Sequence, residues 1–148
     1  MNNYIFTRVS VFRNLKDYKF MPKLEKEKAQ EIENAMDRIL GDNYTKVVLD
    51  NANATTLKYL FENNLVSKST KGVYLDKKNA LSIALFEGEH LYIRSTGHGY
   101  KQSAIKNALD LAKQLSTKLN LAYSDEFGFL MSDITHLGCG LKLECDLD

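Results

Sequence analysis

The side chains best suited to chemistry in this 148-residue chain are basic groups near its two ends. Arg8 and Arg13 lie on or beside one predicted strand near the N-terminus, and Lys142 lies near the C-terminus. Guanidinium groups hold phosphate and carboxylate ligands, so Arg8 and Arg13 are candidates for an anion site. Exposure to solvent or pairing with surface carboxylates is the plainer alternative, and the sequence leaves it open.

Carboxylates and a histidine supply candidate bases in two places. Glu87 precedes Gly88 in a short acidic turn, and Asp133 shares a later loop with His136. A positioned carboxylate or imidazole can accept a proton from a reacting group, so Glu87 is one candidate base and Asp133 with His136 is a candidate acid–base pair. A simple hairpin turn and a solvent-exposed loop are the structural alternatives.

The cysteines do not suggest a metal site. Cys139 and Cys145 have no other cysteine or histidine near them at zinc-binding spacing except His136. The glycines at positions 138 and 140 could bring backbone amides close to a phosphate, although the needs of a turn also explain them. We therefore expect no metal and reduced thiols.

Composition excludes several classes of protein. The chain has 20 basic and 19 acidic residues and a net charge of +1, so no overall field attracts nucleic acid. The apolar content of 44% and the charged content of 26% are those of a globular domain, and we expect one domain over residues 1–148. No apolar run reaches the roughly 20 residues that cross a bilayer, and no signal peptide is recognisable. We expect a cytoplasmic protein that binds neither membrane nor nucleic acid.

Hydrophobic periodicity predicts an α+β fold with a mainly antiparallel sheet flanked by helices. A long helix over residues 100–121 carries an apolar stripe from Ile105 to Leu119 that we expect to be buried. A first helix is expected over 24–40, and Thr55 or Thr56 is expected to cap a short second one. Strands are expected at residues 4–12, 44–49, 73–75, 80–86, 90–95, 127–130 and 141–145.

Four separated stretches share their order and residue pattern with one known family. They are 7–15 (TRVSVFRNL), 65–67 (LVS), 86–93 (FEGEHLYI) and 125–141 (DEFGFLMSDITHLGCGL). Together they resemble the catalytic domain of the phosphagen kinases, or ATP:guanido phosphotransferases, and most of all the bacterial protein-arginine kinases. The resemblance spans nearly the whole chain. It implies the first part of a glutamine-synthetase-like α+β domain.

The resemblance also implies a chemistry. Moving a phosphoryl group from ATP to a guanidine requires arginines that spread charge over the phosphates, and a carboxylate that orients the guanidinium and takes its proton. Ser10 and Tyr92 stand where the family has arginines, and Gly88 stands where it has the catalytic carboxylate. Glu87 is the nearest substitute base.

Three further positions also differ from the family's pattern. Asp133 takes the place of a reactive cysteine, Ser69 that of a nucleotide-contacting histidine, and Lys142 that of an arginine. Lysine keeps the charge but lacks the planar fork that suits phosphate. The residues left as candidates for nucleotide binding are Thr7, Arg8, Ser10 and Lys142.

Two hypotheses from different classes follow. The first is a pseudokinase that acts by binding protein: a full-length arginine kinase, its adaptor or a second copy of itself, with no cofactor. The second is a residual kinase or nucleotide binder in which Arg8, Arg13 and Lys142 hold Mg·ATP and Glu87 acts as base. A phosphoarginine peptide is a further candidate ligand, and a gene product without selected function is a third alternative.

Overall fold

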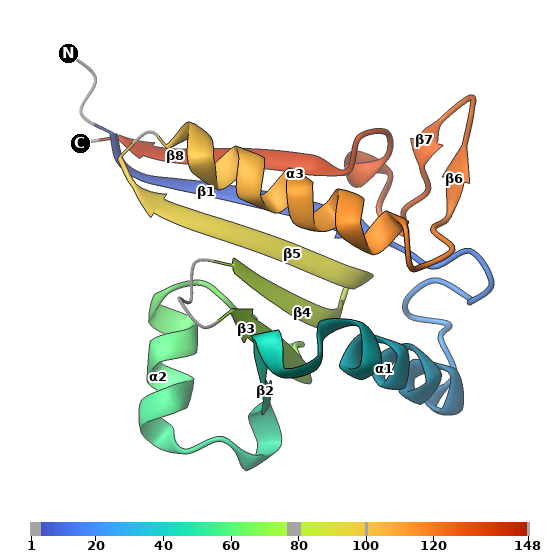
Figure 1. Ribbon diagram of the computed structural model, residues 1–148, viewed down its shortest axis with the longest axis horizontal. Helices are drawn as coiled ribbons and strands as arrows, with labels where there is room; N and C mark the ends of the chain where they lie inside the picture. Colours follow the sequence, from blue (N-terminus) through green and yellow to red (C-terminus); the bar gives the residue numbers. More distant parts are fainter. Residues whose placement is uncertain (1–3, 77–80, 100, 148) are drawn as a thin grey trace.

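The computed structural model describes residues 4–76, 81–99 and 101–147, and its centre is a six-stranded antiparallel sheet (Figure 1). The strands lie in the order β2-β3-β4-β5-β1-β8, so the N-terminal strand pairs with both β5 and the C-terminal β8. A small hairpin of β6 and β7 stands apart from this sheet. The strands are β1 Tyr4–Arg13, β2 Tyr44–Val48, β3 Gly72–Asp76, β4 Leu81–Glu87, β5 Glu89–His98, β6 Tyr123–Ser124, β7 Gly128–Phe129 and β8 Leu141–Leu147.

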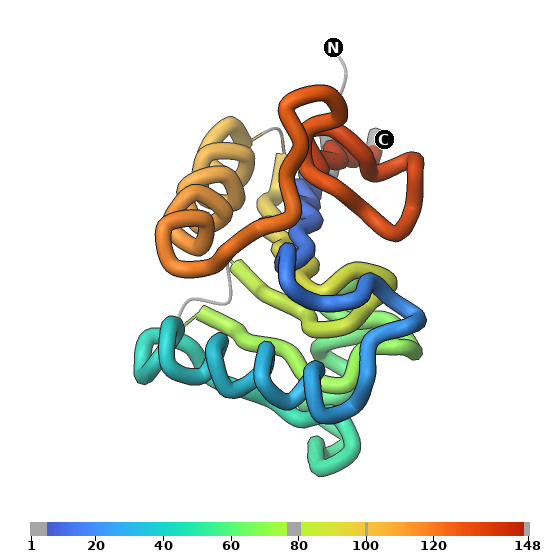
Figure 2. Tube along the Cα trace, turned by 90° about the vertical axis from the view of Figure 1, so that its right-hand side faces the viewer, coloured from blue at the N-terminus to red at the C-terminus, as the bar shows by residue number. Residues whose placement is uncertain are grey.

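Helices lie on both faces of the sheet. Figure 2 shows α1 and α3 on the same side, and the side chains they bury form one core cluster with that face of the strands. The buried Leu60 of α2 belongs to a second cluster on the opposite face. The helices are α1 Lys26–Leu40, α2 Ala54–Glu62 and α3 Gln102–Ser116, and the short 3-10 turns are η1 Gly41–Asn43, η2 Leu49–Asn51 and η3 Ile134–His136.

The predicted α+β class and the mainly antiparallel sheet are confirmed, and the errors lie at element ends. Asn53, rather than Thr55 or Thr56, caps α2, because its side-chain oxygen accepts a hydrogen bond from the Thr56 amide at 2.8 Å. The helix α3 ends at Ser116 instead of residue 121. There the hydroxyls of Ser116 and Thr117 bond back to the Lys113 and Gln114 carbonyls.

The ends of two further elements differ from the prediction. Helix α1 begins at Lys26 rather than at residue 24, and β5 runs on to His98 because it pairs with β1 as far as Phe6. The two-residue strand β6 was not predicted. The predicted starts at Ala80 and Tyr100 lie outside the described residues.

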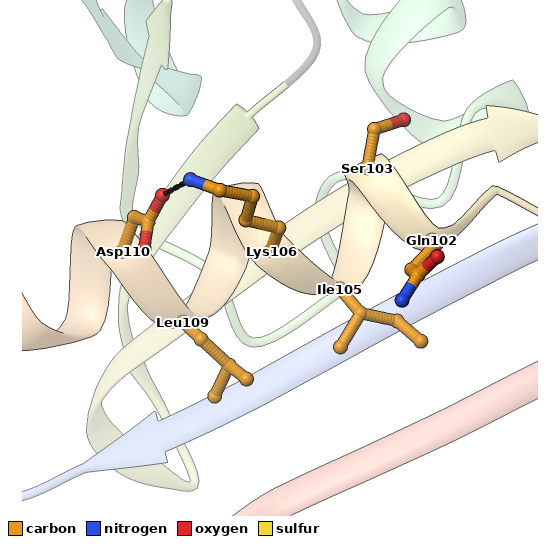
Figure 3. Close-up of a pocket in the computed structure, with 6 residues that line it drawn as sticks. All are labelled: Gln102, Ser103, Ile105, Lys106, Leu109 and Asp110. Atoms are coloured by element: carbon orange, nitrogen blue, oxygen red, sulfur yellow. Dashed lines mark hydrogen bonds and ion pairs between the residues drawn. The ribbon is translucent and has the colours of Figure 1, made fainter.

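The apolar stripe of α3 is only partly buried. Ala104, Ala108 and Leu115 pack against the sheet, whereas Leu109 is 40% exposed, so the expectation that the whole stripe is buried is wrong at that position. Ile105 and Leu109 point away from the helix on one side and line an open hollow of ≈ 580 Å³ (Figure 3). Because α3 packs on β1 and β5, the strip over β8 stays uncovered.

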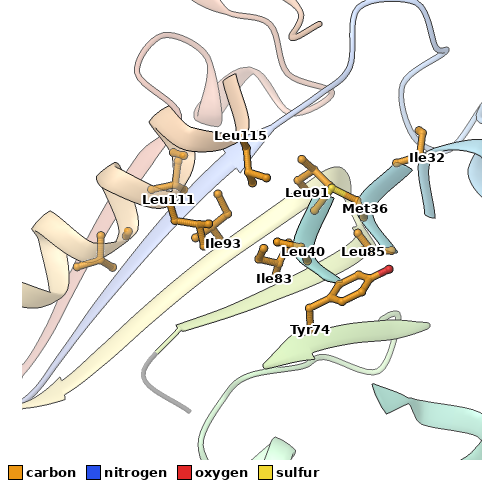
Figure 4. Packing of buried hydrophobic residues seen from close by; sticks show 14 of the residues in the cluster. Ile32, Met36, Leu40, Tyr74, Ile83, Leu85, Leu91, Ile93, Leu111 and Leu115 are labelled. Carbon is orange, nitrogen blue, oxygen red and sulfur yellow. The ribbon is translucent and has the colours of Figure 1, made fainter. Parts of the chain in front are cut away.

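The larger core fills the space between the sheet and the two helices α1 and α3. Figure 4 shows Leu111 and Leu115 of α3 packing beside Ile93, and Met36 of α1 lying near Leu91. Burying side chains of this kind removes apolar area from water at about 25 cal/mol per Å², which is the main term favouring this fold. The larger core therefore anchors the strands from the side of α1 and α3, whereas the opposite face carries the smaller cluster under α2 and, on β1, β5 and β8, a group of polar side chains.

Gly140 should be essential for stability. It has a φ of +57°, and a Cβ placed there would lie 2.7 Å from Arg13 Nη1 and 2.8 Å from the Phe12 carbonyl oxygen. Gly140→Ala should lose about 1–3 kcal/mol through backbone strain, and about 1–3 kcal/mol more through overpacking. Urea unfolding measures the change in the free energy of unfolding.

Gly41 is the matched control, because its φ is +51° and no atom lies within 4 Å of the point that a Cβ would occupy there. Gly41→Ala should show the strain cost alone. Equal losses in the two variants would contradict the packing role of Gly140.

Candidate functional site

The candidate site is the face of β5, β1 and β8 that points away from α1 and α3, called the distal face below. Side chains alternate along a strand, and Val9 and Val11 of β1 enter the helix-side core, so Arg8, Ser10 and Phe12 point to the distal face. Register then adds their cross-strand partners. The distal face consists of Arg8, Ser10, Phe12, Tyr92, Arg94, Lys142 and Glu144.

Three of the four predicted nucleotide-binding residues meet on this face. Ser10 lies opposite Lys142 on β8, and Arg8 lies two residues away on the same side of β1. Thr7 does not join them. It lies on the other side of the strand, fully buried, and its hydroxyl donates a hydrogen bond to the Gly99 carbonyl at 2.5 Å.

Two cations of the distal face, Arg8 and Lys142, share one carboxylate. Glu144 lies 3.1 Å from the Lys142 ammonium and 3.6 Å from the Arg8 guanidinium. The Lys142 side chain is 54% exposed, and such pairs at a surface are worth about 0–1 kcal/mol. Glu144 thereby offsets part of the positive charge that Arg8 and Lys142 could offer to an anion.

Arg94 and Glu87 form a buried ion pair. Their side chains are 6% and 9% exposed, and the Arg94 guanidinium bonds both Glu87 oxygens and the Leu65 carbonyl, the last at 2.7 Å. The Thr70 hydroxyl also donates to Glu87. The predicted candidate base is therefore held by an arginine and a threonine and does not face an open site.

Gly88 forms the turn between β4 and β5, as the sequence predicted. Its φ is +80°, and the space where a side chain would begin is empty to 4 Å. The turn is tight, because Glu87 pairs directly with Glu89 across it. The position that the family resemblance assigns to the catalytic carboxylate thus carries no side chain.

Aromatic rings fill the middle of the distal face. Phe12 stacks on the His136 ring at a centroid distance of 3.9 Å and meets Tyr92 edge-on at 4.4 Å. The Tyr92 hydroxyl donates to Ser10 Oγ at 3.3 Å, and Ser10 is fully buried. The hollow beside them measures only ≈ 280 Å³ and is lined by Phe12, Thr135, His136, Leu141 and Lys142.

Arg13 does not reach this hollow. Its Nη1 donates to the Phe12 and Cys139 carbonyls at 2.7 and 3.0 Å, and its guanidinium lies 3.7 Å from the centre of the Phe129 ring. Burial lowers the pKa of Arg13 to about 10. The side chain thereby fastens residues 130–140, called the return loop below, to the end of β1.

A buried polar cluster holds the other end of the return loop. The Glu89 carboxylate, 1% exposed, accepts hydrogen bonds from the Ser132 and Asp133 amides at 2.9 and 3.1 Å and from Asn14 Nδ2 at 2.6 Å. Asn14 in turn accepts from the His90 amide at 2.7 Å. Sequence analysis did not identify this cluster, although Glu89, His90 and Asn14 all lie in the stretches that carry the family resemblance.

His90 completes the cluster as a neutral ring. Its Nδ1 accepts from the Leu15 amide at 3.0 Å, and its Nε2 lies 3.0 Å from the Lys19 carbonyl, which can only accept. Nε2 therefore carries the proton. Burial lowers the pKa of His90, so the ring stays uncharged at neutral pH and ties β5 to the segment that follows β1.

The side chains of Asp133 and His136 do not hydrogen-bond each other, although the His136 amide donates to the Asp133 carbonyl at 3.0 Å. Asp133 Oδ1 accepts from the amide and hydroxyl of Thr135 at 2.9 and 2.7 Å, which caps η3. His136 Nδ1 instead lies 3.6 Å from the Glu89 carboxylate. Ser69 is exposed, and its hydroxyl lies 2.9 Å from that of Ser67.

The remaining expectations concern metals and membranes. Among residues 4–76, 81–99 and 101–147, no cluster of three or more histidine, cysteine or acidic side chains has metal-binding geometry. Both cysteines are free thiols. Within the same described ranges, no helix has the length and apolar character needed to cross a bilayer.

The Glu89 cluster should make stability depend on pH. Burial acts to raise the pKa of Glu89, but hydrogen bonds from Ser132, Asn14 and Asp133 outweigh it and hold the pKa below the ordinary value of 4.5. Such a carboxylate stabilises the fold above pH 4.5, and the contribution disappears as the pH falls through the lowered pKa. Glu89→Gln should lose about 1.5–3 kcal/mol at pH 7.

The measurement is urea unfolding of wild type and Glu89→Gln across the acid range. The difference between them should shrink below pH 4.5. Glu62→Gln is the control, because Glu62 is 63% exposed and should lose less than about 1 kcal/mol. A Glu89→Gln loss that does not change with pH would contradict this role for the carboxylate.

Comparison with known families agrees with the motifs and the fold. Residues 12–145 match the family described as ATP:guanido phosphotransferase, C-terminal catalytic domain. Among curated proteins, the chain is 26% identical to the protein-arginine kinase of an Exiguobacterium species and 31% identical to that of Listeria welshimeri. These matches cover 93% and 92% of this chain but only 42% and 41% of the relatives, so the chain spans less than half of their length.

Solved structures share the fold. The duplicated taurocyamine kinase from Schistosoma mansoni superposes with a TM-score of 0.86 at 21% identity, over 96% of this chain and 23% of that one. A lombricine kinase superposes with a TM-score of 0.83 at 15% identity, over 98% of this chain and 48% of that one. With the match over residues 12–145, these findings place the chain in the ATP:guanido phosphotransferase family.

Proposed function

We propose that this domain is a catalytically impaired relative of the protein-arginine kinases, a pseudokinase that acts by binding another protein or a second copy of itself. The observation that carries the proposal is the state of the cations on the distal face and of Arg13 beside it. Arg8 and Lys142 share Glu144, Arg94 is paired with Glu87, and Arg13 is bound to backbone carbonyls. An incoming phosphate would compete with a partner at each of them.

The cost of that competition supports the proposal. Removing Glu87 from Arg94 would leave a buried charge without its partner, which costs about 3–5 kcal/mol in proteins. At two positions where the family resemblance calls for arginine, Ser10 and Tyr92 bond each other instead. Each charge-assisted hydrogen bond not made to a phosphate forgoes about 1.5–3 kcal/mol, enough together to remove a micromolar nucleotide site.

The absence of a free base at the expected position points the same way. Gly88 has no side chain, Glu87 is held by Arg94 and Thr70, and Glu89 is held by amides of the return loop. A positioned general base contributes roughly 10²–10⁴-fold to a rate.

Calorimetric titration with Mg·ATP tests this proposal. The chain should release no heat of binding up to millimolar ATP and should transfer no labelled phosphate to an arginine-rich protein. The protein-arginine kinase of Clostridium tetani, 24% identical to this chain, serves as the positive control under the same conditions. Binding at micromolar affinity, or phosphoarginine formation, would favour the alternative of a residual arginine kinase using Arg8, Lys142 and Mg·ATP.

A further inference from the structure

The ring of His136 lies in contacts that suit a charged ring better than a neutral one. It is nearly parallel to the ring of Phe12, with 3.9 Å between the ring centroids and 7° between the ring planes. Two neutral aromatic rings prefer an offset or edge-on contact to a face-to-face stack. A cationic ring gains from the stack instead, because the face of a phenyl ring is negative. The contact with Phe12 is therefore stronger when His136 is protonated on both ring nitrogens.

One edge of the same ring faces a buried carboxylate. His136 Nδ1 is buried and finds no hydrogen-bond partner among residues 4–76, 81–99 and 101–147. It lies 3.6 Å from Oε1 of Glu89, whose side chain is 1% exposed. That distance is too long for a hydrogen bond, but the charge of a carboxylate attracts an imidazolium ring across it. A proton on Nδ1 therefore has its counter-charge already in place.

Charged side chains reach this region from every element around the ring. They are Arg13 of β1, Glu89 of β5, Asp133 of the return loop, and Lys142 with Glu144 of β8. The two cations are bound elsewhere, because Arg13 donates to the Phe12 and Cys139 carbonyls and the Lys142 ammonium lies 3.1 Å from Glu144. Asp133 is exposed. Glu89 is thus the charged group that contacts the His136 ring.

We propose that His136 is a pH-sensitive clasp for the return loop, which closes when the protonated ring is held between Phe12 and the Glu89 carboxylate. Histidine is the side chain whose charge ordinarily changes between about pH 5 and 8. Hydrogen bonds hold the pKa of Glu89 below 4.5 against the effect of burial, so its carboxylate keeps its charge in that range. A fall in pH from about 8 to about 5 therefore adds a cation to the ring while its partner stays an anion.

The clasp would act on the end of the return loop that Glu89 already holds. The Ser132 and Asp133 amides donate to Glu89 at 2.9 and 3.1 Å, so a tighter contact of His136 with the same carboxylate supports these hydrogen bonds. His136 also lines the hollow of ≈ 280 Å³ next to Phe12. A closed clasp keeps the ring in that place on the distal face. The inference goes beyond the proposed function, because it does not depend on what the domain binds.

Hydrogen exchange measured by NMR on the intact chain tests the clasp. The ring signals of His136 report when the ring gains its proton, and the Ser132 and Asp133 amides report how often the loop opens. Protection at these two amides, corrected for the intrinsic pH dependence of exchange, should rise about three- to tenfold as the ring is protonated.

Three variants assign the effect to its groups. His136→Gln should lose the rise and still fold, because the side chain is 27% exposed. His98→Gln is the matched control, since His98 is exposed and belongs to neither contact, and it should keep the full rise. Phe12→Leu removes the aromatic face and should reduce the rise. Circular dichroism establishes that each variant is folded.

The opposite results overturn the inference or a stated part of it. Protection in the wild type that stays level or falls while the His136 ring is protonated would exclude the clasp, whatever the variants do. A rise that survives in His136→Gln would assign the pH dependence to another group. An undiminished rise in Phe12→Leu would exclude the stack as one of the two contacts.

Discussion

The fold around the distal face depends on one buried carboxylate. Glu89 is the point where β5 begins, and its hydrogen bonds reach the end of β1 through Asn14 and the return loop through the Ser132 and Asp133 amides. A charged group is tolerated at 1% exposure only because several donors replace its water. Arg13 closes the other end of the same loop on two carbonyls. The return loop is thus held at both ends, which orients His136 against Phe12.

These contacts bind charged side chains to other parts of the protein, whereas a phosphoryl-transfer site would use such side chains to bind its ligands. Arg94 and Glu87 neutralise each other, and their pairing joins β4 and β5 to the segment after α2 through Leu65 and Thr70. Charge that is bound inside the protein is not offered to phosphate. The domain keeps the family's fold, and the middle of its distal face holds the stacked and edge-on rings of Phe12, Tyr92 and His136.

Much of the architecture was predictable because it follows from local patterns. Alternation along β1 and the spacing of Ala108, Ala112 and Leu115 in α3 specify which faces are buried, and Gly88 specifies a tight turn. The failures came where side chains compete with the backbone, as at Asn53 and Thr117, or where register with a distant strand extends an element, as at His98. The burial of Leu109 was misjudged because helical periodicity does not say how wide the sheet beneath the helix is.

By itself, the sequence determined the α+β class through its hydrophobic periodicity. The resemblance of four ordered stretches to one family indicated the family and the positions at which catalytic residues are expected. It placed Ser10, Arg8 and Lys142 as candidates but could not say that Arg8 and Lys142 share the carboxylate of Glu144. Only the tertiary structure decided that Arg13, Glu87 and Glu89 face inward to partners, and that Thr7 lies on the opposite face. The reason is physical: the partner of a buried charge is set by strand register and loop closure, which join residues far apart in the chain.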